Sequence, residues 1–213
     1  MALVNKKLIK LNNRGVRNVT TFGSVGGGSM TFIKKLTASA SATLSFVDGA
    51  SDVVLDSTYK EYMFTFKDIH PASESTFSFN GSIDSGSNYN VAKTTTLFNA
   101  YHAEGAGGEN LGYRTGEDIA QGTGFQGFSS DYGNDNDQIG CGYLHLFNPS
   151  STTFVKHFIF RGSSIYPSSD SDGMKDQFVA GYANSTSAVD AVQFKFSADE
   201  IDAGDICLYG LTT

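Results

Sequence analysis

The sequence has no tryptophan, only two cysteines, three prolines and few charged residues, which make up 17% of the chain against a usual value of about a quarter. Cys141 and Cys207 are too few for a disulfide framework and lack the spacing of a zinc site, so they fit a reducing compartment. No stretch approaches the ~18 apolar residues of a membrane-spanning helix. The N-terminus has no apolar core of a signal peptide. We therefore expect a soluble protein that is neither exported by a signal peptide nor bound to a membrane.

Glycine, phenylalanine and tyrosine are abundant instead, with 24, 17 and 10 residues in a chain of 213. Serine and threonine occur throughout. Such a composition is typical of short strands that are joined by small-residue turns and packed through phenylalanine. The length is sufficient for one sizeable domain with a real core.

Alternating apolar and polar residues predict strands along most of the chain. The strongest pattern lies in 56–71, where Tyr62, Phe64 and Phe66 share one face. A hairpin-length turn, DIHPASE, follows it. The pattern predicts about eight or nine strands and no long helix, which indicates an all-β, antiparallel, jelly-roll-like sandwich. The expected strands are 42–47, 56–71, 75–82, 94–103, 141–148, 153–162, 177–184, 191–197 and 204–211.

Two regions lack a strand pattern. Residues 104–141 are rich in glycine and have no periodicity, so they are expected to form a long irregular loop. The short ADEIDAG segment before the last strand is compatible with one helical turn.

The charge is unevenly distributed. Residues 37–213 hold 8 basic and 22 acidic groups, a net charge of −14, whereas 1–36 hold seven basic groups and no acidic one. We expect an extended basic N-terminal arm, 1–36, on an acidic β-sandwich domain, 37–213, with the arm anchoring the protein to an acidic partner or a neighbouring copy. Because the arm is short and has no interleaved aromatic residues, nucleic acid is not the expected partner. The anchoring residues are Lys6, Lys7, Lys10, Arg14, Arg17, Lys34 and Lys35.

The motif GTGFQG at 122–127 has the spacing of a dinucleotide-binding fingerprint. That fingerprint needs a strand before it and a helix after it, because the helix N-terminus supplies the amide donors. Here EDIAQ precedes it and FSSDYGNDND follows, and Phe147 stands about where the ribose-binding acid is required. We interpret the motif as a loop in which glycine permits positive φ and close approach to another backbone.

The long loop also contains the residues best suited to a ligand. Its acidic part has oxygen ligands that calcium favours, but the spacing does not match an EF-hand, and solvated turns are the favoured interpretation. Its tyrosines are suited to stacking on a sugar. The candidate ligand residues are Tyr113, Tyr132, Asp131, Asp135 and Asp137.

No catalytic set is evident. If the turn NPSSTT places Asn148 opposite Phe154, then His145 faces His157. Two imidazoles are only half of a zinc site and the sequence names no third ligand, so structural pairing in an aromatic-rich sheet is the favoured interpretation. There is no G-x-S-x-G motif, and the acidic residues have no spacing that forces two of them together. We therefore expect no enzymatic activity, no cofactor and no metal.

Three segments carry a family resemblance: STYKEYMFTFKDIHPAS, GYLHLFNPSSTTFVKHF and the C-terminal AVQFKFSADEIDAGDICLYGL. They resemble small virion proteins of marine tailed bacteriophages, which end in a phenylalanine strand, a short I-x-A/S-G turn and an I-x-L-Y-G strand. The matching residues are Phe194, Phe196, Ile201, Gly204, Ile206, Leu208, Tyr209 and Gly210.

The resemblance implies a β-sandwich component of the virion, assembled in the bacterial host cytoplasm. The implied role is capsid decoration, cement, fibre or tail-associated protein, and the resemblance assigns no functional residue. The implied partners are other virion proteins and copies of the same chain, with a trimer expected from the habit of viral assemblies. The alternative is a lectin-like module for host attachment, which recognises surface glycans through the 104–140 loop.

Overall fold

The computed structural model describes residues 29–212, apart from 106–107 and 169–170. Within these residues the chain forms twelve β-strands and no helix. The strands are β1 (Met30–Thr37), β2 (Leu44–Val47), β3 (Glu61–Pro71), β4 (Ser75–Ser82), β5 (Lys93–Ala103), β6 (Glu109–Tyr113), β7 (Gln126–Tyr132), β8 (Gly140–Phe147), β9 (Lys156–Tyr166), β10 (Gly173–Ala183), β11 (Ala191–Phe196) and β12 (Ile201–Leu211).

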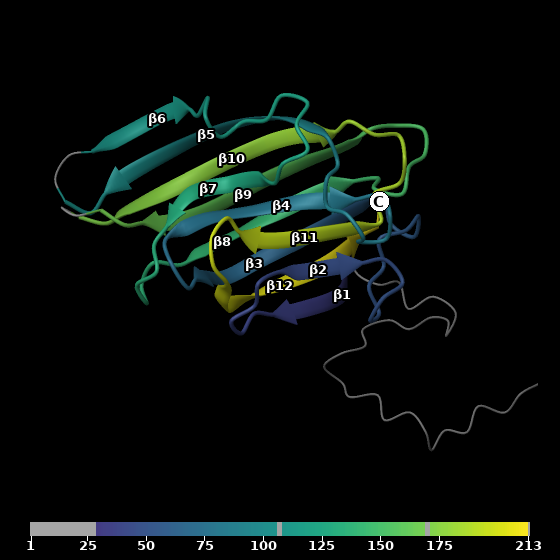
Figure 1. The fold of residues 1–213 in the computed structure, drawn as a ribbon, viewed down its shortest axis with the longest axis horizontal. Coiled ribbons are helices and arrows are strands. Elements are labelled where there is room, and N and C mark those ends of the chain that lie inside the picture. The colour runs from purple at the N-terminus through teal and green to yellow at the C-terminus, as the bar shows by residue number, and fades with distance from the viewer. Residues whose placement is uncertain (1–28, 106–107, 169–170, 213) are drawn as a thin grey trace, which may run out of the picture.

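The strands form two antiparallel sheets that pack on each other (Figure 1). The larger sheet has the order β1-β12-β3-β8-β9-β10-β5-β6, and the smaller has the order β2-β11-β4-β7. In Figure 1 the larger sheet extends past the smaller one at the β5–β6 end. The all-β sandwich expected from the sequence is therefore confirmed.

The strand order is that of a jelly roll with four inserted strands. When β5, β6, β9 and β10 are set aside, eight strands remain, and numbered along the chain they lie in the orders 1-8-3-6 and 2-7-4-5. This is the double Greek key of a jelly roll. The inserted strands all join the larger sheet and extend it beyond β8.

Several details differ from the sequence-based expectation. DIHPASE does not close a hairpin, because β3 and β4 lie in different sheets and the segment crosses between them. Residues 104–141 contain β6, β7 and the start of β8 as well as loops. The ADEIDAG segment forms the end of a bend at 197–199 and the first residues of β12 in place of a helical turn. The region 30–37 is strand β1, which pairs with β12, so the sandwich begins before residue 37.

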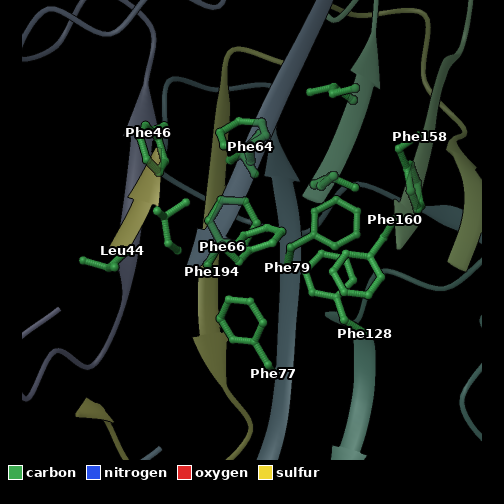
Figure 2. Packing of buried hydrophobic residues seen from close by; sticks show 14 of the residues in the cluster. Leu44, Phe46, Phe64, Phe66, Phe77, Phe79, Phe128, Phe158, Phe160 and Phe194 are labelled. Carbon is green, nitrogen blue, oxygen red and sulfur yellow. The ribbon is translucent and has the colours of Figure 1, made fainter. Parts of the chain in front are cut away.

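Phenylalanine fills the space between the sheets, as the composition indicated. Ten of the seventeen phenylalanines are buried there. Phe128 of the smaller sheet stacks on Phe160 of the larger one, with ring centroids 4.0 Å apart (Figure 2). Phe194 lies at the centre, with six other phenylalanine rings within 6.4 Å of its own. Aromatic pairs add to the free energy of folding beyond the area that they bury.

The C-terminal residues that carry the family resemblance have structural roles. Ile201, Ile206 and Leu208 are fully buried. Gly204 lies at an irregularity of the β12–β3 pairing with φ of +124°, and a Cβ there would be 2.7 Å from the carbonyl oxygen of Asp68. Only glycine fits such a position without strain. The motif therefore specifies how the last strand packs.

Candidate functional site

The backbone carbonyl groups of the GTGFQG segment accept hydrogen bonds from side chains of the sandwich. Lys93 donates from Nζ to the Gly124 carbonyl at 2.6 Å. The buried Asn80 donates from Nδ2 to the Thr123 carbonyl at 2.9 Å. β7 follows the motif where a dinucleotide site needs a helix. A loop whose carbonyls bind amino and amide groups from the core is a structural element of the sandwich.

The positive φ expected within this motif falls elsewhere. Gln121, directly before it, has φ of 54°, and none of the glycines of the motif has a positive φ. The close backbone approach is present, because Gly122 and Lys93 exchange two backbone hydrogen bonds, at 2.9 and 3.2 Å.

Two lysines are buried at one end of the larger sheet. Lys93 and Lys156 both pair with Ala183, from the two sides of β10. Lys156 donates to the carbonyls of Ser185 and Ser187 at 3.0 and 2.5 Å. Burial lowers the pKa of both amines, and that of Lys93 falls to about 8. The carbonyl groups of the loops replace the water that these amines lose on folding.

The candidate ligand residues of the 104–140 region do not form one surface. Tyr132 is buried against Phe77 and Phe196, so its ring is not available for stacking on a sugar. Tyr113 is exposed on β6, and its hydroxyl donates to Asp118 Oδ2 at 2.6 Å. Sequence alternation could not reveal this difference, because the segment between the two tyrosines has no regular period.

The acidic residues of that region are engaged separately. The Asp131 carboxylate lies 3.1 Å from Lys175 Nζ. Asp135 belongs to a turn in which its backbone carbonyl accepts a hydrogen bond from the backbone N–H of Gln138 at 2.8 Å. Asp137 is exposed. In the part of the chain that the structure describes, no three His, Cys, Asp or Glu side chains are grouped so as to hold a metal ion.

The residues of the expected arm divide into two groups. Lys34 and Lys35 lie in β1 at the edge of the larger sheet, and Lys35 pairs with Asp205 at 3.1 Å. The other five lie outside the described residues: Lys6, Lys7, Lys10, Arg14 and Arg17.

The two histidines expected to face each other are displaced by two residues. His145 pairs with Ile159 across β8 and β9, so it lies diagonal to His157 on the same face. His145 contacts the carboxylate of Glu61. The direct pairing of His145 with His157 that the turn suggested is therefore absent.

The outward face of the larger sheet carries most of the large hydrophobic side chains that are exposed in the described part of the chain. Strand alternation in a solvated sheet places polar residues outside. Here eight of the ten such side chains among the described residues lie on that face, and the other two, Ile83 and Phe154, lie in loops. The eight are Met30, Phe32, Phe98, Leu111, Tyr113, Tyr143, Ile159 and Met174.

A row of planar side chains crosses this face from β8 to β6. Direct cross-strand pairs join Tyr143, Arg161, Phe178, Phe98 and Tyr113 in that order. Phe98 and Phe178 stack with centroids 4.8 Å apart, and the Arg161 guanidinium lies 4.6 Å from the centre of the Phe178 ring. We call these five residues the ridge.

A hollow lies on each side of the ridge. The first has a volume of about 420 Å³ and small residues at its floor, between Ile159 and Tyr182. The second has a volume of about 470 Å³, and Gly142 and Gly162 lie among its lining residues. Small residues line part of each hollow, Ala180 and Gly181 in the first and Gly142 and Gly162 in the second. The ridge between the hollows consists of large side chains.

A third, polar hollow of about 260 Å³ lies beside the exposed Tyr113. It is lined by Tyr113, Arg114 and Glu117 together with Thr115 and Gly116. Arg114 Nε donates to Glu117 Oε1 at 3.0 Å. An exposed tyrosine beside paired charged groups has the composition of a small site for a polar ligand.

Comparison of the chain with protein-family models, with curated proteins and with solved structures finds no match. The described residues include no helix that is long and apolar enough to cross a membrane.

Proposed function

We propose that the chain is a structural virion protein of a tailed bacteriophage, a self-assembling jelly-roll module on the capsid or tail surface. The observation that carries the proposal is the apolar outward face of a complete sandwich. Soluble monomers rarely expose contiguous apolar patches larger than a few hundred Å², and larger ones mark contacts with other proteins. The similarity of the C-terminal segment to small phage virion proteins supports the same role.

The N-terminal segment has the charge of an anchor. Five basic residues and no acidic one precede the described sandwich, and the whole chain has a net charge of −7. A basic segment on an acidic body is attracted to an acidic surface, such as another virion protein or a neighbouring copy.

Cosedimentation with purified particles that lack this chain tests the anchoring role. The triple substitution Lys6→Glu, Lys7→Glu and Lys10→Glu should abolish sedimentation with the particles, because it reverses the charge of the segment. The matched control is Lys60→Glu, Lys67→Glu and Lys195→Glu, which makes the same net change on the sandwich and leaves every expected anchoring residue in place. If both variants sediment with the particles like the unmodified chain, the N-terminal segment is not the anchor.

A second candidate function is recognition of host glycans at the polar hollow beside Tyr113. The observation that favours it is the exposed tyrosine next to the Arg114–Glu117 pair, because sugars bind through aromatic stacking together with polar side chains. Binding to a glycan array should be lost on Tyr113→Ala and kept on Tyr143→Ala, which removes another exposed tyrosine from the larger sheet. Binding that survives Tyr113→Ala would exclude this hollow as the site.

A further inference from the structure

The geometry points to the outward face of β8, β9, β10, β5 and β6 as the surface on which a second copy of this chain docks, through a two-fold axis that places the ridge of each copy in a hollow of the other. This inference rests on the proposed function, in which the protein assembles with itself, and it names the surface. The argument depends on the shape, the charge and the area of the face.

The shape of the face is self-complementary. The ridge runs across the strands, with the first hollow on one side of it and the second hollow on the other. A two-fold axis parallel to the ridge, lying in the interface, brings each ridge opposite a hollow of the partner. Two-fold interfaces need a surface of this kind, because the same patch contributes both halves of the contact.

The charge in the two hollows allows close packing. Arg161 and Asp176 are the charged residues that line the second hollow, and they pair with each other at 3.1 Å. The first hollow is lined by Thr, Ala, Gly and aromatic or aliphatic side chains, with His157 and Tyr182 as its titratable residues. A second copy would therefore bury no net charge there, whereas unpaired charges would oppose such burial.

The area of the face is that of a stable interface. The five strands have 8, 11, 11, 11 and 5 residues, and at about 3.4 Å per residue and a spacing of about 4.8 Å they cover roughly 750 Å² per copy. Specific protein–protein interfaces bury about 800 Å² per partner. Sheets of this kind pack face to face about 10 Å apart, which is the arrangement inferred here.

Sedimentation velocity of the full chain, over a wide concentration range, tests the inference. The unmodified chain should sediment as a dimer that dissociates on dilution. Ile159→Glu and Met174→Glu each place a charge beside one hollow, at a side chain that is already half exposed. Each should raise the dissociation constant about a hundredfold, because it buries a charge in the interface. Phe154→Glu is the matched control, since Phe154 is exposed in the β8–β9 loop and lines neither hollow.

Circular dichroism and thermal unfolding of each variant separate loss of association from loss of fold. A monomer at all concentrations would overturn the inference, and so would a trimer or a folded Ile159→Glu variant that still dimerises. The outcome is independent of the particle measurements. If the chain is found in virions but is monomeric in solution, the proposed function is supported and the dimer interface is contradicted. If the chain dimerises but is absent from virions, the interface is supported and the proposed function is contradicted.

Discussion

Phe194 shows how single residues determine this fold. Its ring is fully buried and contacts phenylalanines from both sheets, including Phe66 of β3 at 5.1 Å and Phe77 of β4 at 6.1 Å (Figure 2). The core depends on rings of this kind, because the chain has no tryptophan and no disulfide between the described cysteines.

Replacing Phe194 with alanine should lower the free energy of unfolding by about 3–5 kcal/mol, the usual cost of a large cavity in a core. Urea denaturation monitored by tyrosine fluorescence measures the change. Phe154→Ala, the same substitution at an exposed position, should change the stability by less than about 0.5 kcal/mol. Equal losses at the two positions would contradict the assignment of the core.

Lys93 should make the stability depend on pH. Its pKa is about 8 in the folded protein against 10.5 for an ordinary lysine, so the unfolded chain binds the proton more tightly. The free energy of unfolding should therefore rise from pH 8 towards pH 10, with a full contribution of about 3 kcal/mol. Above pH 10 the buried Tyr62 acts in the opposite direction, because its raised pKa lets only the unfolded state ionise.

Urea denaturation of Lys93→Met at a series of pH values between 7 and 10 isolates this contribution. The difference in stability between the unmodified chain and Lys93→Met should shift in favour of the unmodified chain as the pH rises. The exposed Lys60→Met should show no such shift. A difference that does not vary with pH would mean that Lys93 keeps an ordinary pKa in the folded protein.

In the strand with the clearest alternation, β3, the sequence was sufficient to predict which residues are buried. Tyr62, Phe64 and Phe66 alternate with polar residues, and the structure buries all three. The burial of Lys93 and Tyr132 could not be predicted in this way. Lys93 precedes three threonines, which mark no apolar face, and Tyr132 follows a glycine-rich segment without a period.

At the scale of elements, irregular pairing explains two stretches that the sequence pattern missed, β1 and the start of β12. β1 contains a register shift between Phe32 and Lys34, so its apolar residues do not keep a period of two. The start of β12 has two such shifts, between Ile201 and Asp205, and was therefore expected to be a helical turn. Sheet order depends on pairing between distant segments, such as β1 with β12, and local alternation contains no information on it.

Truncation tests the boundary of the sandwich. Removal of residues 2–28 should leave the melting temperature within a few degrees of that of the full chain, because the two described sheets stay complete. Removal of residues 2–37 also deletes β1 and leaves β12 as an unpaired edge. That shorter chain should aggregate or unfold at a clearly lower temperature. Equal melting temperatures for the two truncations would contradict the assignment of β1 to the domain.

At the scale of the whole molecule, the inserted strands are what distinguish this jelly roll. β5, β6, β9 and β10 extend one sheet beyond its partner, and together with β8 they form the ridge and its two hollows. The sequence indicated the sandwich but not this face, because outward-facing apolar residues look the same as inward-facing ones in a short strand. The candidate ligand loop was proposed because its residues are close together in the sequence. In the fold its two tyrosines have different surroundings, since Tyr113 is exposed and Tyr132 is buried.

The most direct test of the virion role is the number of copies of this chain in purified particles, measured by quantitative mass spectrometry against the major coat protein. A self-assembling surface module should be present in a fixed ratio that is the same in independent preparations. Its removal by washing at high salt would fit an anchor that depends on charge. Absence of the chain from purified particles, or a ratio that varies between preparations, would contradict the proposal.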